Sequence, residues 1–159
     1  MGFTRQKRAF PKYISGFYYR LLHHLARHVF PSKLRVLIHK MRGVKIGKGV
    51  FIGLDVNIDD DDPTIVRLED DVTISSGCLI LTHRRDMTLY KKGGYTKDLP
   101  MFKAPVTIKK GVNVGAKCII MPGVTIEEGA IIGSGSVVTK DIPSYTLAIG
   151  APAKLIKEY

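Results

Sequence analysis

The amino-acid sequence predicts an all-β solenoid, a coil of short strands that carries N-terminal α-helices and one long extruded loop. Two observations predict this fold: apolar residues recur at every sixth position, and glycines fall between them. An α-helix cannot keep a six-residue period on one face, and a long strand would show a period of two. Short strands separated by tight turns explain the period, because every sixth side chain then points into the coil. The clearest run consists of Ile108, Val114, Ile120, Ile126, Ile132 and Val138.

The first element in chain order is helical. Apolar residues fall at helical spacing between Ile14 and Val29, with basic residues elsewhere around the helix. Pro31 should end this helix, and Ser32 can cap a second helix that runs to Gly43. The apolar face fits two roles, and the sequence leaves both open. It could cap the open strand edges at the end of the solenoid, or it could anchor the protein on anionic lipid.

Positive charge is concentrated in the same part of the chain. Residues 1–54 hold twelve Lys or Arg and no acidic residue, whereas the remainder holds thirteen bases and fourteen acids. The net charge of +11 therefore comes from the N-terminal third. No nucleic-acid recognition motif accompanies this charge, so we predict no nucleic-acid partner. We divide the chain into a basic amphipathic helical segment, residues 1–43, and a solenoid domain, residues 44–159.

The solenoid is interrupted twice. Three six-residue units make one triangular coil, which gives about four coils in all. At the first break, four extra residues follow the first coil. At the second break, residues 84–105 do not show the six-residue period. We expect that segment to be a loop extruded from the solenoid wall, and long loops of this kind are usually functional. The apolar positions of the first two coils are Ile46, Ile52, Ile58, Leu68, Ile74 and Ile80.

Cysteine usage and hydropathy indicate a reducing compartment. Cys78 and Cys118 occupy inward positions of the repeat, where small buried thiols need no disulfide. No stretch without a charged residue exceeds twelve residues, which is too short for a transmembrane helix. The basic N-terminal region is not followed by the continuous apolar run of a signal peptide. We expect a cytoplasmic protein, with peripheral contact at the inner face of the membrane as the open alternative.

The C-terminal half carries a specific signature, in which SVVTKDIP is followed by GAPAKLIK. With the repeats before it, this run resembles the C-terminal half of hexapeptide-repeat O-acetyltransferases. The nearest groups are the galactoside and maltose acetyltransferases and the sugar O-acetyltransferases of surface-polysaccharide biosynthesis. The resemblance covers residues 44–159 and is weak over the N-terminal helices. It implies a left-handed parallel β-helix, a homotrimer with active sites at the subunit boundaries, and acetyl-CoA as the donor.

One histidine is the candidate catalytic base. Acyl transfer to a hydroxyl needs a group that removes the proton as the oxygen attacks the thioester, and neutral imidazole suits neutral pH. Four of the five histidines lie in the basic N-terminal segment, and only His83 lies in the repeat domain, at the root of the 84–105 loop. The resemblance implies that a histidine at this place is the catalytic base and that the loop reaches a neighbouring subunit.

The resemblance also implies a donor site. Backbone groups at Ala116 and Ser134 would bind the pantetheine arm, and the amide of Ala116 would stabilise the oxyanion. Lys154 and Lys157 match a basic pair near the 3′-phosphate. The family often has arginine there, so lysine keeps the charge but loses bidentate geometry. The other implied donor-site residues are Thr139 and Lys140 beside the lower arm, and Pro152 and Ala153 along the adenine.

Acceptor-site candidates lie at the first break and in the loop. Asn57 and the run of acids that begins at Asp59 offer amide and carboxylate groups, which suit sugar hydroxyls. The resemblance places such residues against the acceptor or against the histidine loop. Asp86, three residues after His83, is a candidate for orienting the loop or the imidazole. Tyr90, Tyr95 and Met101 could supply an apolar wall.

These observations predict an acetyl-CoA-dependent O-acetyltransferase that acts on a carbohydrate, a glycan or glycan precursor in surface-polysaccharide biosynthesis. The repeats cannot exclude a related acyltransferase acting on serine, an antibiotic or an amino-sugar nitrogen. A zinc enzyme of the same fold, such as a γ-class carbonic anhydrase, would need three histidines around the metal. The repeat region has one, so we predict no metal. A non-catalytic scaffold or lipid-binding module is the fourth alternative.

Overall fold

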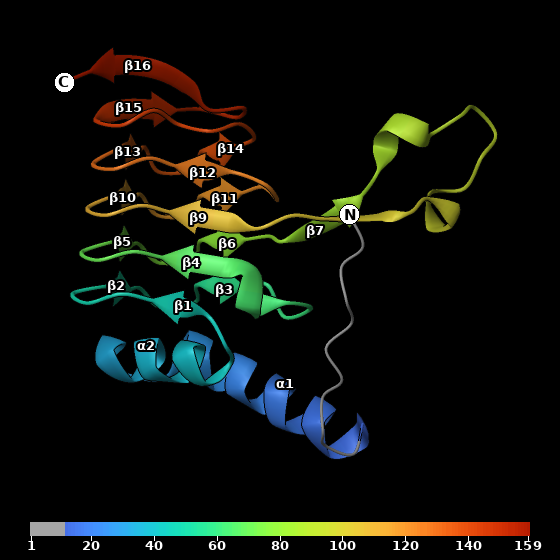
Figure 1. The fold of residues 1–159 in the computed structure, drawn as a ribbon, viewed down its shortest axis with the longest axis horizontal. Coiled ribbons are helices and arrows are strands. Elements are labelled where there is room, and N and C mark those ends of the chain that lie inside the picture. The colour runs from blue at the N-terminus through green and yellow to red at the C-terminus, as the bar shows by residue number, and fades with distance from the viewer. Residues whose placement is uncertain (1–11) are drawn as a thin grey trace.

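The computed structural model describes residues 12–159, with side chains from Arg20 onward. Its main body is a stack of short strands with two helices across one end (Figure 1). The strands form three sheets that wind as four successive coils, and neighbouring strands from different coils run parallel. The predicted solenoid of short strands is therefore confirmed.

Each coil contributes one strand to each sheet. The first sheet contains β1 (Lys45–Ile46), β4 (Val66–Leu68), β9 (Val106–Ile108) and β12 (Thr125–Ile126). The second contains β2 (Phe51–Ile52), β5 (Thr73–Ile74), β10 (Asn113–Val114), β13 (Ile131–Ile132), β15 (Thr146–Ile149) and β16 (Lys154–Glu158). The third contains β3 (Asn57–Ile58), β6 (Leu79–Ile80), β11 (Ile119–Ile120) and β14 (Val137–Val138). The C-terminal strand β16 pairs with β15 in antiparallel orientation.

The second residue of each two-residue strand points inward and builds the core. The register stacks these residues directly on one another, as in Ile74 against Val114 and Ile120 against Val138. Burial of each such side chain contributes about 1.5–3 kcal/mol. The predicted inward positions from the second strand onward are confirmed as buried: Ile52, Ile58, Leu68, Ile74, Ile80, Ile108, Val114, Ile120, Ile126, Ile132 and Val138. Cys78 and Cys118 are buried with them as free thiols.

The turns on either side of the third sheet position the candidate site. Because its strands are parallel, the chain enters all of them from one side and leaves them on the other. We name these two sides the entry edge and the exit edge. The entry edge comprises the turns 53–56, 75–78, 115–118 and 133–136, and the exit edge comprises 59–62, 81–82, 121–124 and 139–141.

The N-terminal segment forms two helices, α1 (Lys12–His28) and α2 (Ser32–Met41). The first ends before Pro31, as predicted. The prediction that Ser32 caps the second helix is wrong, because Pro31 occupies the cap position in extended conformation and no side chain caps the helix. The second helix ends at Met41, before Gly43, which adopts a positive φ of 98°. The predicted apolar residues Ile14, Phe17 and Tyr18 lie outside the described side chains.

Both helices pack across the first coil. The buried guanidinium of Arg35 in α2 donates to the carbonyl oxygen of Ile52 at 2.9 Å and to that of Val29 at 2.8 Å. On α1, the Nε of Arg27 donates to the carboxylate of Asp55 at 3.0 Å. The helices therefore cover the open strand edge of the first coil, as one of the two predicted roles requires. The change from helix to strand falls between residues 41 and 45, and the division into two domains stays a prediction.

The chain leaves the stack between β6 and β9. Here β7 (His83–Arg85) and β8 (Met101–Lys103) form an antiparallel pair that projects from the solenoid (Figure 1). Two short 3₁₀ turns, Met87–Leu89 and Thr96–Asp98, lie between them. A third 3₁₀ turn, Pro63–Ile65, fills the first break in the repeat. The sequence predicted 84–105 as a loop extruded from the solenoid wall and predicted no strands within it, because strands of three residues are too short to show a period.

No helix within residues 12–159 is both long enough and apolar enough to cross a bilayer.

Candidate active site

His83 and Asp59 meet at the exit edge of the third sheet. Asp59 directly follows β3, and His83 begins β7 three residues after β6, so the pairing of β3 with β6 brings them together. Nδ1 of His83 lies 2.7 Å from Oδ2 of Asp59. The Asp59 side chain is 1% exposed and the His83 side chain 29% exposed. The pair therefore has a buried carboxylate behind an imidazole that solvent and ligands can reach.

Several donors hold Asp59 as a carboxylate. Oδ2 accepts the backbone N–H of Thr82 at 2.7 Å and its hydroxyl at 2.8 Å, and Oδ1 accepts the N–H of Asp61 at 3.0 Å. Burial alone would raise the pKa of Asp59, but these hydrogen bonds and the nearby His83 outweigh it and lower that pKa below its ordinary value. Asp59 is therefore ionised near neutral pH and can only accept hydrogen bonds.

An ionised Asp59 fixes the tautomer of His83. Since the carboxylate cannot donate, Nδ1 of His83 must carry the proton that lies between them. Nε2 then holds the lone pair of the neutral ring. No described residue forms a hydrogen bond to that nitrogen. The arrangement can accept a proton at Nε2, while the carboxylate stabilises the imidazolium that results.

A buried arginine braces the turn that carries Asp59. Nη2 of Arg42, at the end of α2, donates to the carbonyl oxygens of Ile58 at 2.9 Å and Asp59 at 3.0 Å. Nη1 of the same guanidinium lies 3.0 Å from Nδ1 of His39. Burial lowers the pKa of Arg42 to about 10, so it stays charged near neutral pH. The helical segment thus fixes the backbone beneath the candidate base.

The predicted pantetheine residues lie on the opposite edge. Ala116 and Ser134 sit on the entry edge, in turns of successive coils, and the Ala116 N–H donates to Oγ of Ser134 at 3.1 Å. Their backbones can approach because a Cβ at Gly115 would come within 2.6 Å of the Ser134 nitrogen. The amide proposed for the oxyanion is therefore directed at a hydroxyl in this structure. One chain does not bring these residues next to His83.

The remaining donor-site candidates lie toward the C-terminal end. Thr139 and Lys140 follow β14 on the exit edge, two coils beyond His83. Pro152 and Ala153 lie in the turn between β15 and β16. The Ala153 N–H donates to the carbonyl oxygen of Val137 in β14 at 2.8 Å. Lys154 and Lys157 lie on β16 and are exposed, with Nζ of Lys157 4.4 Å from the ring centre of Tyr159.

The acceptor candidates separate into near and distant groups. Asn57 stands on β3, two residues before Asp59, and is partly buried on the outer face of the third sheet. Asp86 does not contact the imidazole: Oδ1 accepts the N–H of Thr88 at 3.1 Å and its hydroxyl at 2.6 Å. It therefore shapes the loop by capping a 3₁₀ turn. Tyr90, Tyr95 and Met101 are exposed on the loop.

Sequence reasoning missed Thr82 and Arg42. Thr82 is fully buried and supplies two of the hydrogen bonds to Asp59. A polar residue at the end of an apolar strand, directly before the candidate histidine, was the available signal. No sequence feature distinguished Arg42. It is one of many basic residues in the N-terminal segment, and the spacing of these residues does not show which of them is buried.

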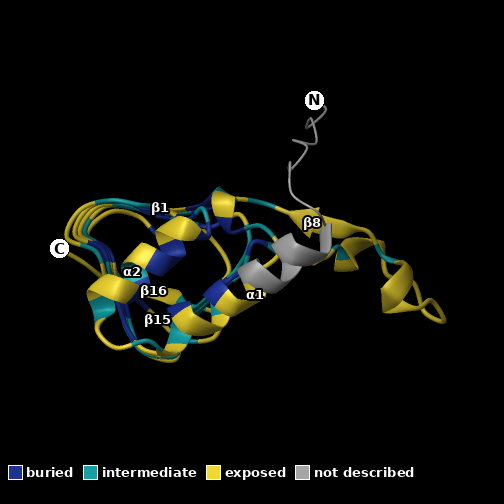
Figure 2. Cartoon of the chain, turned by 90° about the horizontal axis from the view of Figure 1, so that it is seen from below, coloured by how far each residue is buried: buried dark blue, intermediate teal, exposed yellow. Residues whose placement is uncertain are grey.

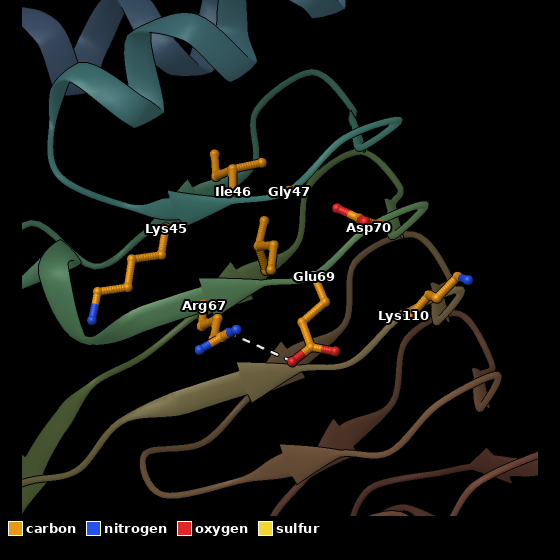
Figure 3. Close-up of a pocket in the computed structure, with 8 residues that line it drawn as sticks. Lys45, Ile46, Gly47, Arg67, Glu69, Asp70 and Lys110 are labelled. Atoms are coloured by element: carbon orange, nitrogen blue, oxygen red, sulfur yellow. Dashed lines mark ion pairs between the residues drawn. The ribbon is translucent and has the colours of Figure 1, made fainter.

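A separate hollow of about 550 Å³ lies over the turns from the first sheet to the second (Figure 3). Nε of Arg67 and Oε1 of Glu69 form an ion pair within it at 3.5 Å. None of the predicted site residues lines this hollow, so we do not include it in the candidate site. Its lining residues are Lys45, Ile46, Gly47, Arg67, Leu68, Glu69, Asp70 and Lys110.

Two family models match the solenoid. Residues 105–140 match the bacterial transferase hexapeptide (six repeats), and residues 43–82 match the hexapeptide repeat of succinyl-transferase. The Escherichia coli galactoside O-acetyltransferase is 34% identical over 117 residues, which cover 72% of this chain and 54% of that protein. The chain thus spans little more than half the length of that relative.

Two solved structures share the fold. A maltose O-acetyltransferase from Clostridium difficile 630 superposes with a TM-score of 0.71 at 23% identity, over 93% of this chain and 89% of that one. A mutant N-acyltransferase from Bacillus cereus, in complex with dTDP and coenzyme A, superposes with a TM-score of 0.56 at 23% identity, over 69% and 60%. The repeats, the family models and the E. coli relative show that the chain belongs to the hexapeptide-repeat acetyltransferase family, and the solved structures share its fold, a left-handed parallel β-helix.

Proposed function

We propose that this chain is an acetyl-CoA-dependent O-acetyltransferase that transfers an acetyl group to a hydroxyl of a carbohydrate. The Asp59–His83 pair carries the proposal, since Asp59 holds Nδ1 of the imidazole while no described residue bonds Nε2 and the ring is partly open to solvent. The sugar acetyltransferases among the relatives support a carbohydrate acceptor. We further propose a role on a glycan or glycan precursor in surface-polysaccharide biosynthesis, in the cytoplasm, where free thiols such as Cys78 and Cys118 persist.

In this mechanism Nε2 of His83 removes the proton from the acceptor hydroxyl as its oxygen attacks the thioester carbonyl. Asp59 stabilises the imidazolium, which then returns the proton to the departing sulfur. The thioester carbon–sulfur bond breaks as the new ester bond forms. The coenzyme A in the complex of the B. cereus relative supports the donor, and the exposed Lys154 and Lys157 can pair with its phosphates.

We propose that the active unit is a homotrimer. Leu79, Ile119 and Val137 stack on the outer face of the third sheet and form an apolar column between the entry and exit edges. A neighbouring subunit packed near this column would place its own entry edge against the His83 edge. That arrangement would unite candidates that one chain keeps apart.

The test is release of free thiol from acetyl-CoA in the presence of a panel of sugars. Replacing His83 with Ala should lower the rate by about 10²–10⁴-fold, the usual contribution of a general base. The matched control is His24→Ala, which removes an exposed histidine from α1 and should leave the rate unchanged. Thiol release that is equal in wild type and His83→Ala would overturn the assignment.

The alternative is that the acceptor is an amino-sugar nitrogen or a non-sugar hydroxyl. Including amino sugars and serine in the same panel tests whether either group is acetylated. The N-acyltransferase with a related fold makes this alternative worth testing. Mild hydroxylamine cleaves an O-acetyl ester and leaves an N-acetyl amide intact. A product that resists hydroxylamine would therefore exclude O-acetylation and support the N-acyl alternative.

A further inference from the structure

The helical end of the molecule exposes an apolar face that points away from the solenoid. Figure 2 views this end from below, with α1 and α2 lying across it and many of their residues exposed. We name it the underside, and define it by five large apolar side chains that solvent reaches. They are Leu21 and Leu25 on α1, and Leu34, Leu37 and Met41 on α2.

Helix geometry places the α1 residues on the underside. Arg27 points to the solenoid, because it pairs with Asp55 in the first coil. Leu22 and Ala26 are buried against Ile38 of α2. At about 100° per residue, Leu25 lies almost opposite Arg27, and Leu21 lies one turn before Leu25. The exposed leucines of α1 therefore face away from the coil.

The same argument places the α2 residues beside them. Arg35 and His39 are buried, and Arg35 donates to the first coil. Leu37 lies two residues from each of them, on the opposite side of the helix. Leu34 lies three residues before Leu37 and Met41 four residues after it, each about one turn away, so the three side chains share a face. The two helices thus present one continuous apolar surface on either side of their buried seam.

The rim of the underside is basic. Arg20, Lys33 and Lys40 are exposed on the two helices. Residues 20–54 contain no acidic residue, and the first acid in the sequence, Asp55, is already paired with Arg27. Exposed apolar side chains on helices that carry exposed bases and no acids are typical of helices that lie in a membrane interface.

We propose that the underside docks on an anionic lipid surface, with α1 and α2 parallel to the membrane plane. The leucines and Met41 enter the boundary between headgroups and acyl chains, and the basic rim binds lipid phosphates. Charge disfavours a second copy of this chain as the occupant, since two undersides would bring the exposed Arg20, Lys33 and Lys40 of one copy against those of the other. An anionic bilayer satisfies both the apolar face and the charge.

This orientation has a consequence for the candidate site. Arg42 ends α2 and hydrogen-bonds the backbone of Asp59, so the Asp59–His83 pair lies within the coils nearest the docking face. An acceptor anchored in the same membrane would meet the site from a short distance. This consequence depends on the proposed function, whereas the docking itself does not.

The experiment is flotation of the full chain with vesicles of phosphatidylcholine, with and without phosphatidylglycerol. We expect flotation with the anionic vesicles and a large loss of binding when salt is raised from about 0.1 M to about 1 M, which screens surface charge. Leu37→Glu should weaken binding by on the order of tenfold or more, because it places a carboxylate in the docking face. Lys33→Gln with Lys40→Gln should weaken it by on the order of tenfold.

Matched controls separate docking from general surface effects. Leu155→Glu changes a side chain at the far end of the stack that is 55% exposed, close to the 52% of Leu37. Lys91→Gln with Lys92→Gln removes two exposed bases from the loop. Both controls should float like wild type. Thiol release in solution by Leu37→Glu should equal that of wild type, so failure of docking and failure of acetyl transfer are read separately.

Three results would overturn the proposal. The first is the absence of flotation with anionic vesicles at low salt. The second is equal binding to neutral and anionic vesicles, which would remove the basic rim from the mechanism. The third is self-association in solution that Leu37→Glu abolishes, which would make a second copy the occupant of the underside.

Discussion

Asp59 has the most constrained side chain in the candidate site. Its two carboxylate oxygens accept from Thr82, Asp61 and His83, and its own carbonyl oxygen accepts from Arg42. The carboxylate can therefore neither rotate nor leave without abandoning several hydrogen bonds. We infer that Asp59 acts on the reaction through His83, as a positioning residue.

Replacing Asp59 with Asn should lower kcat on the order of tenfold to a hundredfold with little change in the KM for acetyl-CoA. The amide keeps the size of the side chain but removes the charge that holds Nδ1–H of His83 and stabilises the imidazolium. Steady-state kinetics across pH measures the effect. Asp70→Asn, which changes an exposed carboxylate outside the candidate site, is the control and should behave like wild type. An unchanged kcat and pH profile in Asp59→Asn would show that another group orients the ring.

His39 makes folding stability depend on pH. Its side chain is fully buried in α2, no described residue hydrogen-bonds its Nε2, and burial lowers its pKa from 6.5 to about 3. Unfolded chains therefore bind a proton below about pH 6.5 that the folded protein rejects. As the pH is lowered from 6.5 to about 3, the contribution of His39 should reduce the free energy of unfolding by about 1.4 kcal/mol per pH unit. Above pH 6.5 this contribution should not change with pH.

Denaturant unfolding of wild type and His39→Gln at several pH values measures that slope. The variant should lose part of the acid dependence whatever its absolute stability. His23, whose pKa is also lowered by burial, keeps its own share in both proteins. Parallel pH dependences in the two proteins, or an NMR titration of His39 near pH 6.5, would contradict the prediction.

The strand is the smallest element whose stability follows from the repeat. Each two-residue strand alternates one outward and one inward side chain, and only the inward one joins the core. β13 provides a matched pair within one strand, because Ile132 is 1% exposed and its neighbour Ile131 is 37% exposed. The same substitution at these two positions isolates burial from strand propensity.

Ile132→Ala should destabilise the protein by about 2–5 kcal/mol, since it opens a cavity in a packed column. Ile131→Ala should cost less than about 1 kcal/mol. Chemical denaturation of both variants measures the difference. Equal losses at the two positions would mean that the inward column does not carry the stability of the coil.

At the scale of the whole molecule, the third sheet separates the candidate residues. His83 lies on its exit edge, and Ala116 and Ser134 lie on its entry edge. In the proposed trimer, each chain would contribute His83 to one site and Ala116 and Ser134 to another. Assembly with a neighbour is the simplest way to join an imidazole from one chain with a donor groove from another.

Mixed trimers test this directly. His83→Ala lacks the base, and Ala116→Glu places a carboxylate where the anionic donor would bind. Each variant alone should be inactive. Trimers refolded from an equal mixture should recover about one quarter of the wild-type rate, because a site needs an intact base from one chain and an intact groove from its neighbour. Sedimentation of each variant checks that the trimer forms, and a mixture with no recovered activity would place the whole site within one chain.

The sequence by itself determined the repeat, the inward columns, the helical segment and the isolated histidine of the repeat domain. These features are local or periodic, so each can be found from spacing alone. Only the tertiary structure decided that Asp59 contacts His83, that Asp86 caps a turn in the loop and that Arg42 is buried beneath the site. The contact of Arg42 with Ile58 spans 16 positions and depends on the packing of α2 on the first coil, and that of Asp59 with His83 spans 24 positions and depends on the pairing of β3 with β6. Their geometry depends on where the repeat is broken, and a spacing pattern cannot show which side chains a break brings together.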